Sequence, residues 1–464
     1  MSSASSLTRA LCAIALALPL HAGLASAEER EEDLTTLGLE ELMNIEVTSV
    51  SKKLEKRSGA AAALYVITEE DIRRSGATSI PEALRLVPGV EVSRIDSNKW
   101  AIGVRGFGSR LARSMLVLID GRSVYTPLFA GTYWEVQDTL LEDIDRIEVI
   151  RGPGGTLWGA NAVNGVINII TKHSRDTQGL LATAGGGTEE RAFGSARYGG
   201  TLGETFTYRL YGKYFDRDGG FVPRGDDYDA WSMSRGGFRT DWAMGPQDTL
   251  KVQGDLYDGD AGQHAVITRF RPPFTQVVED DATLSGANLL GRWRHEVSDR
   301  SDLALQAYYD NTYRREPSFR ERRNTFDLDF QHRFGIPWRQ EIIWGLGYRL
   351  TADNTGSVPT IVFRPRDRSD DLYSLFAQDE VTVIEDKLRL IVGSKFEHND
   401  YSGFEFQPSG RLVWTPAGSH VVWGSISRAV RTPSRLDHDL ELTAPPIAPG
   451  TFPRLAYLGV VHDH

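Results

Sequence analysis

The chain has 464 residues, of which 40% are hydrophobic, and a formal net charge of −11 at pH 7. This acidic balance argues against nucleic acid as a partner, because phosphate backbones are bound by a surplus of Lys and Arg. The chain has a single cysteine, which excludes an internal disulfide.

The first 27 residues have the pattern of a cleaved export signal. Arg9 is their only charge, residues 10–20 are almost wholly apolar, and Ala25, Ser26 and Ala27 form a small-residue cleavage site. The apolar run is too short to span a bilayer as a helix. Cleavage after Ala27 also removes Cys12, which leaves 51 positive against 63 negative charges and no thiolate for a metal site.

Residues 28–58 form a polar leader around one β-prone run. The run is I-E-V-T-S-V, and the polar sequence S-K-K-L-E-K-R follows it. The leader allows two interpretations. The run is either the first strand of the next domain, or a short extended segment that a partner protein captures as an added strand.

Residues 59–172 predict a compact α/β domain of ordinary size. β-Branched runs predict strands, and apolar residues at helical spacing predict two short helices. The strands are expected at residues 64–68, 90–95, 101–105, 115–119, 147–150 and 165–171, and the helices at 69–75 and 80–87.

From residue 173 to residue 464 the pattern changes to strands of about ten residues in which apolar and polar side chains alternate. Phe206, Tyr208 and Leu210 face one way, for example, while Thr207 and Arg209 face the other. A soluble antiparallel sandwich would show the same alternation. The strand length, the export signal and the aromatic residues near strand ends favour a transmembrane β-barrel. These aromatic residues include Trp231, Trp242, Trp293, Trp344 and Trp414.

The most distinctive segment is residues 145–172, D-R-I-E-V-I-R-G-P-G-G-T-L-W-G-A-N-A-V-N-G-V-I-N-I-I-T-K. Its glycines allow a phosphate-binding loop as an alternative interpretation. Two features argue against that loop: the Lys-Ser/Thr of a Walker motif is missing, and no helical pattern follows the turn.

The same segment resembles the end of the plug domain in TonB-dependent outer-membrane receptors. Three further blocks match this family in the same order, namely residues 69–90, V-R-G-F at 104–107 and L-V-L-I-D-G-R at 116–122. The resemblance implies an α/β plug domain inside an antiparallel transmembrane β-barrel, in the outer membrane of a Gram-negative bacterium.

The resemblance also implies the partners. TonB, with ExbB and ExbD, would supply energy from the inner membrane, and outer-membrane lipid would surround the barrel. The family's TonB box would lie at Ile45, Glu46, Val47, Thr48, Ser49 and Val50. No cofactor, resident metal or catalytic residue is implied, and we interpret His462 and His464 as a chain end rather than a metal site.

Two groups of plug residues are candidates for the site. Aromatic side chains in the stretches 96–100 and 125–134 suit planar chelators, although they could equally pack the plug against the barrel wall. These candidates are Trp100, Tyr125, Phe129, Tyr133 and Trp134. Four arginines are expected to meet lumenal carboxylates and hold the plug, with binding of an anionic ligand as the alternative. They are Arg105, Arg113, Arg122 and Arg151.

The sequence predicts about thirteen barrel strands, whereas the resemblance implies twenty-two. We therefore expect an incomplete barrel, as in a fragment or the product of a truncated gene. The run S-I-S-R-A-V-R-T-P-S at 425–434 also resembles a family motif that lies inside the barrel rather than at its end.

Three classes of function follow from these patterns. The first is a TonB-dependent receptor, with a ferric siderophore as the expected ligand and cobalamin or haem as alternatives. The second is a passive porin, which would lack the plug blocks. The third is an enzyme, for which the sequence offers no nucleophile–base spacing and no H-E-x-x-H motif.

Overall fold

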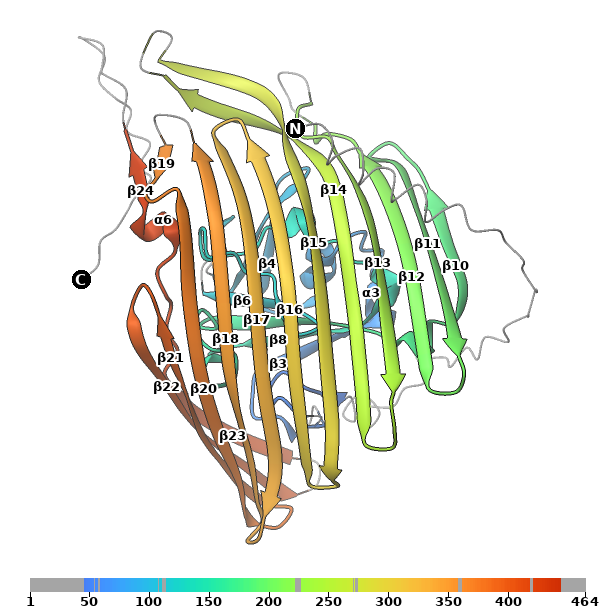
Figure 1. The fold of residues 1–464 in the computed structure, drawn as a ribbon, viewed down its shortest axis with the longest axis vertical. Coiled ribbons are helices and arrows are strands. Elements are labelled where there is room, and N and C mark those ends of the chain that lie inside the picture. The colour runs from blue at the N-terminus through green and yellow to red at the C-terminus, as the bar shows by residue number, and fades with distance from the viewer. Residues whose placement is uncertain are drawn as a thin grey trace.

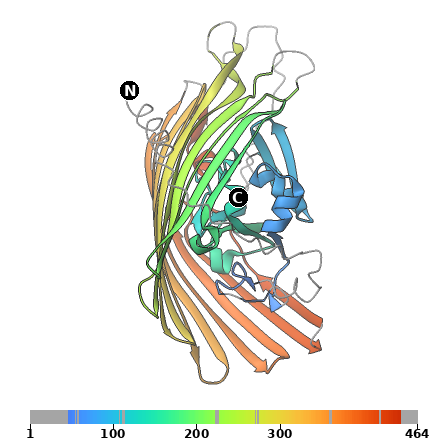
Figure 2. The same cartoon turned by 90° about the vertical axis from the view of Figure 1, so that its right-hand side faces the viewer.

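The computed structural model describes residues 46–443, apart from 54, 57–58, 107, 111–113, 222–226, 270, 272–273, 358–360 and 418–419. A large curved sheet forms a wall, and a smaller α/β domain lies against its concave side (Figures 1 and 2). Among these residues, no helix is both long and apolar enough to cross a bilayer.

The wall contains the predicted thirteen strands, each antiparallel to its neighbours in chain order. They are β10 (Gly179–Gly185), β11 (Glu190–Leu202), β12 (Phe206–Arg217), β13 (Trp231–Ala243), β14 (Asp248–Thr268), β15 (Thr275–Ser298), β16 (Ser301–Glu316), β17 (Phe319–Ile336), β18 (Gln340–Ser357), β20 (Asp367–Ile384), β21 (Leu388–Asn399), β22 (Gly403–Ala417) and β23 (His420–Ser427). Within the described residues β10 and β23 form the two edges, so the sheet is an open arc.

The alternation of side chains along the wall strands is the predicted one. On β12, Leu210 and Tyr214 face outward and are 48% and 47% exposed, whereas Arg209 faces the plug and is 5% exposed. On β17, Phe326 faces outward and Asp327 inward. An apolar outer face avoids the cost of burying polar groups in lipid, and the polar inner face needs partners inside the arc.

Most wall strands are longer than the ten or so residues that the pattern predicts, and β14 and β15 are the longest, at 21 and 24 residues. Their pairing continues to Thr268 opposite Thr275. The two strands project beyond their neighbours as a two-stranded arm, seen at the top of Figure 1. Apolar and polar residues stop alternating where the arm leaves the wall. The pattern that predicts the wall strands therefore does not predict the arm.

The plug contains a five-stranded sheet in the order β3-β8-β9-β6-β7, with β6 and β9 parallel. A separate hairpin, β4 and β5, flanks this sheet. The plug strands are β3 (Leu64–Thr68), β4 (Val90–Asp96), β5 (Lys99–Val104), β6 (Met115–Ile119), β7 (Arg122–Ser123), β8 (Ile144–Arg151) and β9 (Gly165–Thr171). Its helices are α3 (Glu69–Ser75), α4 (Ile80–Ala83) and α5 (Gly155–Trp158), with 3-10 turns η3 (Leu84–Leu86), η4 (Trp134–Val136), η5 (Leu141–Asp143) and η6 (Ser174–Thr177).

Local signals explain most plug elements. Helix α3 starts at a capping box between Thr68 and Asp71 and stops at Gly76, whose φ of 68° favours glycine. The helix expected at 80–87 divides into α4 and the 3-10 turn η3. The expectation of no helix after the glycine-rich turn was wrong, since the one-turn helix α5 follows it.

The hydrophobic core of the plug continues into the wall. Ile67, Ile147 and Ile167 are fully buried in the plug, and they belong to one cluster with Phe215 of β12 and Trp231 of β13. Inward positions of β12–β15 are therefore apolar where the plug rests on them. This contact keeps the plug sheet close to one sector of the wall.

The N-terminal segment 46–56 folds back on the plug. Strand β1 (Glu46–Val47) pairs with β2 (Glu55–Lys56), and Val47 is fully buried. The fully buried Glu148 carboxylate of β8 accepts hydrogen bonds from the backbone N–H groups of Thr48, at 3.1 Å, and Ser49, at 2.7 Å.

Side chains from the plug and the wall hold the same segment. Trp158 Nε1 donates to the Ser49 carbonyl at 2.8 Å, and Arg411 of β22 donates to the Val50 carbonyl at 3.0 Å. Most of the backbone groups of residues 48–50 thus bond to side chains rather than to a neighbouring strand. Such a segment can leave as a unit without breaking the plug sheet.

We predict that Glu148→Ala releases this segment while the plug stays folded. The change leaves two buried N–H groups without acceptors, which costs about 1–3 kcal/mol each, or about 2–6 kcal/mol together, so amide exchange should be roughly 30-fold faster or more. Hydrogen exchange of the peptide 46–53, followed by mass spectrometry, measures the effect. Glu91→Ala, at an exposed position on β4, is the control, and equal exchange in both variants would rule out Glu148 as the anchor.

Candidate functional site

The interface between plug and wall has two sectors of opposite polarity. In the first, the acidic sector, plug carboxylates meet basic side chains of β11–β14. Asp143 lies 2.5 Å from Arg197 and 3.2 Å from Arg209, and Asp138 lies 2.9 Å from Lys213. These side chains are 4–13% exposed, so their attraction is only weakly screened by solvent.

Asp120 continues the acidic sector. Its carboxylate lies 3.9 Å from Lys251 and 4.0 Å from Arg239, and it accepts hydrogen bonds from Gln253 and from the Thr171 backbone. Burial alone would raise the pKa of Asp120, but Lys251 and Arg239 outweigh it and hold the pKa below its usual range. The carboxylate therefore stays charged at neutral pH and ties the turn after β6 to the wall.

In the second, the basic sector, plug cations meet acidic side chains of β16–β20. Arg122 Nη1 lies 2.5 Å from Asp310. Lys53 Nζ lies 2.9 Å from Glu341 and 2.7 Å from Glu380. One pair has the opposite polarity, because Glu135 of the plug contacts Arg314 of β16.

The glycine-rich turn packs on the wall instead of cradling a phosphate. A Cβ added at Gly155 would collide with Gln407 of β22, and one added at Gly159 would collide with Glu397 of β21. The Ala160 backbone N–H donates to Glu397 at 2.7 Å. Gly159 also has a φ of +87°, which favours glycine, so these residues let the turn approach the barrel closely, a role that sequence spacing alone did not reveal.

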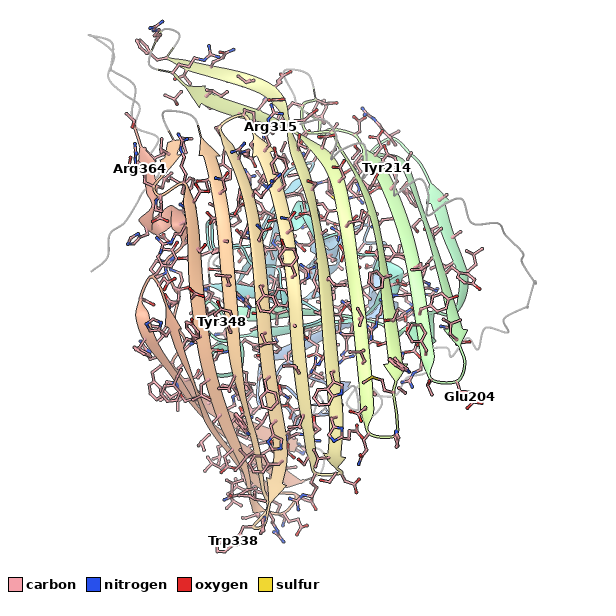
Figure 3. The ribbon with its side chains drawn as sticks, in the orientation of Figure 1. Glu204, Tyr214, Arg315, Trp338, Tyr348 and Arg364 are labelled. Atoms are coloured by element: carbon pink, nitrogen blue, oxygen red, sulfur yellow. The ribbon has the colours of Figure 1, made fainter. Side chains whose placement is uncertain are left out.

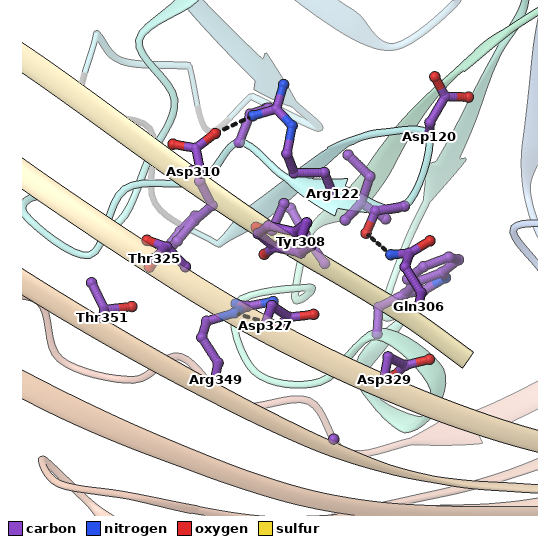
Figure 4. Close-up of a pocket in the computed structure, with 18 of the residues that line it drawn as sticks. Asp120, Arg122, Gln306, Tyr308, Asp310, Thr325, Asp327, Asp329, Arg349 and Thr351 are labelled. Carbon is purple, nitrogen blue, oxygen red and sulfur yellow. Dashed lines mark hydrogen bonds and ion pairs between the residues drawn. The ribbon is translucent and has the colours of Figure 1, made fainter. Parts of the chain in front are cut away.

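A cavity of about 430 Å³ separates the plug from the wall and is lined by residues of both sectors, including Asp120 and Lys251 of the acidic sector and Arg122 and Asp310 of the basic sector. Figure 4 shows Asp120 and Arg122 of the plug on one side, with Tyr308, Asp327 and Arg349 among the wall residues that face them. Thr48 and Lys52 of the N-terminal segment also line the cavity. The cavity therefore adjoins the segment that Glu148 holds.

The five aromatic ligand candidates do not form one exposed surface. Trp100 is 4% exposed and packs edge-on against Trp231 at 6.0 Å, since β5 begins at residue 99 and not in a loop. Phe129 and Trp134 are 3% and 5% exposed and pack in hydrophobic clusters. Their large side chains fill space between plug and wall, which was the alternative interpretation.

The two remaining aromatic candidates are more accessible. Tyr125 is half-buried and lines the cavity. Tyr133 lies with its ring 3.8 Å from the guanidinium of Arg314 and 4.8 Å from the ring of Phe129. In this conformation Tyr125 is the candidate best placed to meet a ligand inside the arc.

The four candidate arginines have different surroundings. Arg122 pairs with the wall through Asp310. Arg105 donates to the carbonyl of Arg151 at 2.8 Å, and Arg151 donates to the carbonyl of Pro88 at 2.6 Å, so both bond within the plug. Arg113 and Ile45 lie outside the described residues.

The motif at 425–434 leads into a segment that contacts the plug. After β23, Val430 accepts a hydrogen bond from the Asn161 backbone, and Arg435 donates through its backbone to Pro127. Arg435 begins helix α6 (Arg435–His438) and is fully buried between Asp353 and Asp439. The adjoining strand β24 (Leu440–Leu442) pairs with β19 (Ile361–Phe363).

Among the described residues there is no group of three or more His, Cys, Asp or Glu side chains that could hold a metal ion. The buried carboxylates of the interface are instead paired with Arg and Lys.

We predict that docking of the N-terminal segment tightens as pH rises. Burial lowers the pKa of Lys52 to about 8, although Asp329 lies 3.8 Å away. In a released segment the Lys52 pKa returns to about 10.4. The released state thus binds more protons between these two pKa values, so docking gains stability as pH rises through this window and loses it as pH falls.

A nitroxide label on a cysteine introduced at Ile45 measures this docking, because the chain after residue 27 has no other cysteine. Label mobility should fall between pH 8 and 10 in the parent chain and stay constant in Lys52→Met. A pH response of the same size in Lys52→Met would assign the titration to another group.

Comparisons with known proteins agree with this architecture. Residues 56–166 match the TonB-dependent receptor plug domain, and residues 174–450 match the TonB-dependent receptor-like β-barrel. The ferric enterobactin receptor of Pseudomonas aeruginosa is 23% identical over 454 residues, covering 82% of this chain and 60% of that protein. The iron-regulated outer membrane virulence protein of Vibrio cholerae is 27% identical, covering 81% of this chain and 58% of that protein.

A shorter match joins this chain to the vitamin B12 transporter of Vibrio vulnificus, 33% identical over 28% of this chain and 20% of that protein. Among solved structures, a ferric enterobactin receptor mutant of P. aeruginosa superposes with a TM-score of 0.66 at 18% identity, covering 84% of this chain and 64% of that one. The siderophore receptor PirA of Acinetobacter baumannii gives the same TM-score at 17% identity, covering 82% and 62% of the two chains.

The chain thus spans about 60% of the length of the first relative it matches. Plug and barrel matches together cover most of its residues, and the two domains meet as a plug meets a barrel wall. The chain belongs to the TonB-dependent receptor family.

Proposed function

We propose that the protein of this chain takes up a ferric siderophore across the outer membrane, driven by TonB with ExbB and ExbD. The main support for the proposal is the way in which the plug is held against the wall. A polar domain fills the concave side of the wall and is held by buried ion pairs, which suits a gate better than an open pore. The names of the two longer relatives, which concern iron, favour a ferric ligand.

We further propose domain boundaries at 1–27 for the export signal, 28–58 for the leader with the TonB box, 59–172 for the plug and 173–464 for the barrel. The export signal and the transmembrane pattern of the wall together support a location in the outer membrane of a Gram-negative bacterium. A porin is a poorer description, because the plug occupies the space that its channel would need.

The proposed opening step begins at the N-terminal segment. TonB would capture the box at residues 45–50 as an added strand once the segment leaves Glu148. Because Thr48 and Lys52 line the cavity, their withdrawal removes one side of its lining. The apolar contact with β12–β15 would keep the rest of the plug against the wall, so that the path opens along the cavity.

Cobalamin is the second candidate ligand, because one relative carries the name vitamin B12 transporter. Haem, the third candidate of the sequence analysis, has no comparable support. Tyr125, Arg122 and Arg349, which line the cavity, suit any of these planar or anionic ligands.

A gene deletion tests the ligand. The deletion strain should fail to grow on one ferric siderophore under iron limitation while it grows on ferric salts and on cobalamin, and the restored gene should return radioactive iron uptake. Loss of cobalamin use, with every siderophore still supporting growth, would instead establish the second candidate.

A matched pair of variants tests the TonB contact. Val47→Pro removes a backbone donor and blocks strand addition, so iron uptake should fall to the level of a strain without TonB. Val47→Ala keeps the donor and should retain most of the uptake. Normal transport by Val47→Pro would mean that the TonB contact lies elsewhere in the leader.

A further inference from the structure

Three arginines meet on the outer face of the wall, at the end of the β16–β17 hairpin. Arg315 of β16 stands directly opposite Arg320 of β17, and Tyr313 stands opposite Arg322. Inward and outward positions alternate, and the neighbouring Arg314 and Glu321 face inward and are 5% and 2% exposed. Arg315, Arg320 and Arg322 are exposed on the opposite face. We call these three residues the outer arginine cluster.

The outer arginine cluster has no acidic partner within the part of the chain that the structure describes. Arg320 donates to the Asn354 side chain at 3.2 Å, and the Arg322 guanidinium lies 5.7 Å from the Tyr313 ring centroid. Nearby Glu316 and Glu321 are bound to inward arginines instead. Like charges directly across two strands destabilise the pair, so this arrangement favours an anion between them.

The cluster also lies just above the apolar outer band. Outward positions of β17 are apolar or aromatic from Ile336 up to Phe326, apart from His332. They become polar at Asn324 and cationic at Arg322 and Arg320. A strand rises about 3.3 Å per residue and tilts by about 40°, so Arg322 stands roughly 10 Å above Phe326. From this height the long arginine side chains can reach the layer of lipid headgroups.

The orientation of the wall places the cluster on the outer leaflet. At the opposite end, every pair of neighbouring wall strands is joined by two to four residues, as at 299–300, 337–339 and 385–387, whereas the cluster's end carries the longer connections 218–230 and 269–274 beside the two-residue turn 317–318. Figure 3 shows Arg315 at one end of the wall and Trp338 at the other. Short turns mark the periplasmic side of outer-membrane barrels. Lys53 of the leader also meets the wall near the short-turn end, through Glu341.

We propose that the outer arginine cluster binds the phosphate groups of an outer-leaflet lipid headgroup. Guanidinium groups match phosphate oxygens in two-pronged hydrogen bonds, and here three of them face the lipid side instead of the lumen. A siderophore inside the arc cannot reach them, so the occupant is the surrounding lipid. The proposal rests on membrane placement and does not depend on which ligand is transported.

The test uses the full chain in detergent micelles and two probes, diphosphorylated lipid A and the same glycolipid without phosphates. The parent chain should bind the phosphorylated lipid about tenfold more tightly than the other. Arg315→Gln with Arg320→Gln and Arg322→Gln should reduce that preference below about twofold, whereas replacement of the three by Lys should retain part of it.

The matched control removes three cations at the short-turn end, through Arg300→Gln, Arg339→Gln and Lys387→Gln, all at exposed positions. This control should keep the preference for phosphate, and equal far-ultraviolet circular dichroism should show that all variants fold alike. An unchanged preference in the cluster variant, or an equal loss in the control, would overturn the proposal. Equally tight binding of both glycolipids by the parent chain would also overturn it, because the phosphate groups would then contribute nothing.

Discussion

The structure depends on one constraint, which is that charges on the inner face of the wall must find partners inside the arc. Strands in lipid keep an apolar outer face, so their alternate residues point inward, and here many of these are Arg, Lys, Asp or Glu. A buried charge without a partner costs several kcal/mol. The plug supplies the partners, with Asp120, Asp138 and Asp143 on one side and Arg122 and Lys53 on the other. Plug and wall therefore stabilise each other through charge.

The same constraint explains how a well-fixed plug can also open. Ion pairs and polar contacts separate at lower cost than an apolar core, because water can replace the lost partners. The apolar part of the interface lies on β12–β15, and the cavity is lined by wall residues from β13 to β21. The N-terminal segment adjoins the cavity and bonds mainly to side chains. Movement is thus expected where the polar contacts are, while the apolar contact serves as the fixed side.

Much of the fold could be predicted from the sequence, because strand alternation and plug motifs are local signals. The thirteen wall strands and all six expected plug strands are present. Which side chains pair across the interface between plug and wall could not be predicted from these local signals. Asp120 and Lys251 lie far apart in sequence, and nothing local pairs them. An aromatic side chain can equally pack against neighbours or bind a ligand, and only the fold shows that Trp100 and Phe129 are buried.

The central claim is that charge pairing seats the plug, and a double-mutant cycle at Arg122 and Asp310 tests it most directly. Both side chains are about 90% buried and lie 2.5 Å apart. Urea unfolding of Arg122→Ala, Asp310→Ala and the double variant should give a coupling of about 1.5–3 kcal/mol. The swapped pair, Arg122→Asp with Asp310→Arg, should recover part of the loss. Additive effects within about 0.5 kcal/mol, with no recovery in the swapped pair, would contradict the account.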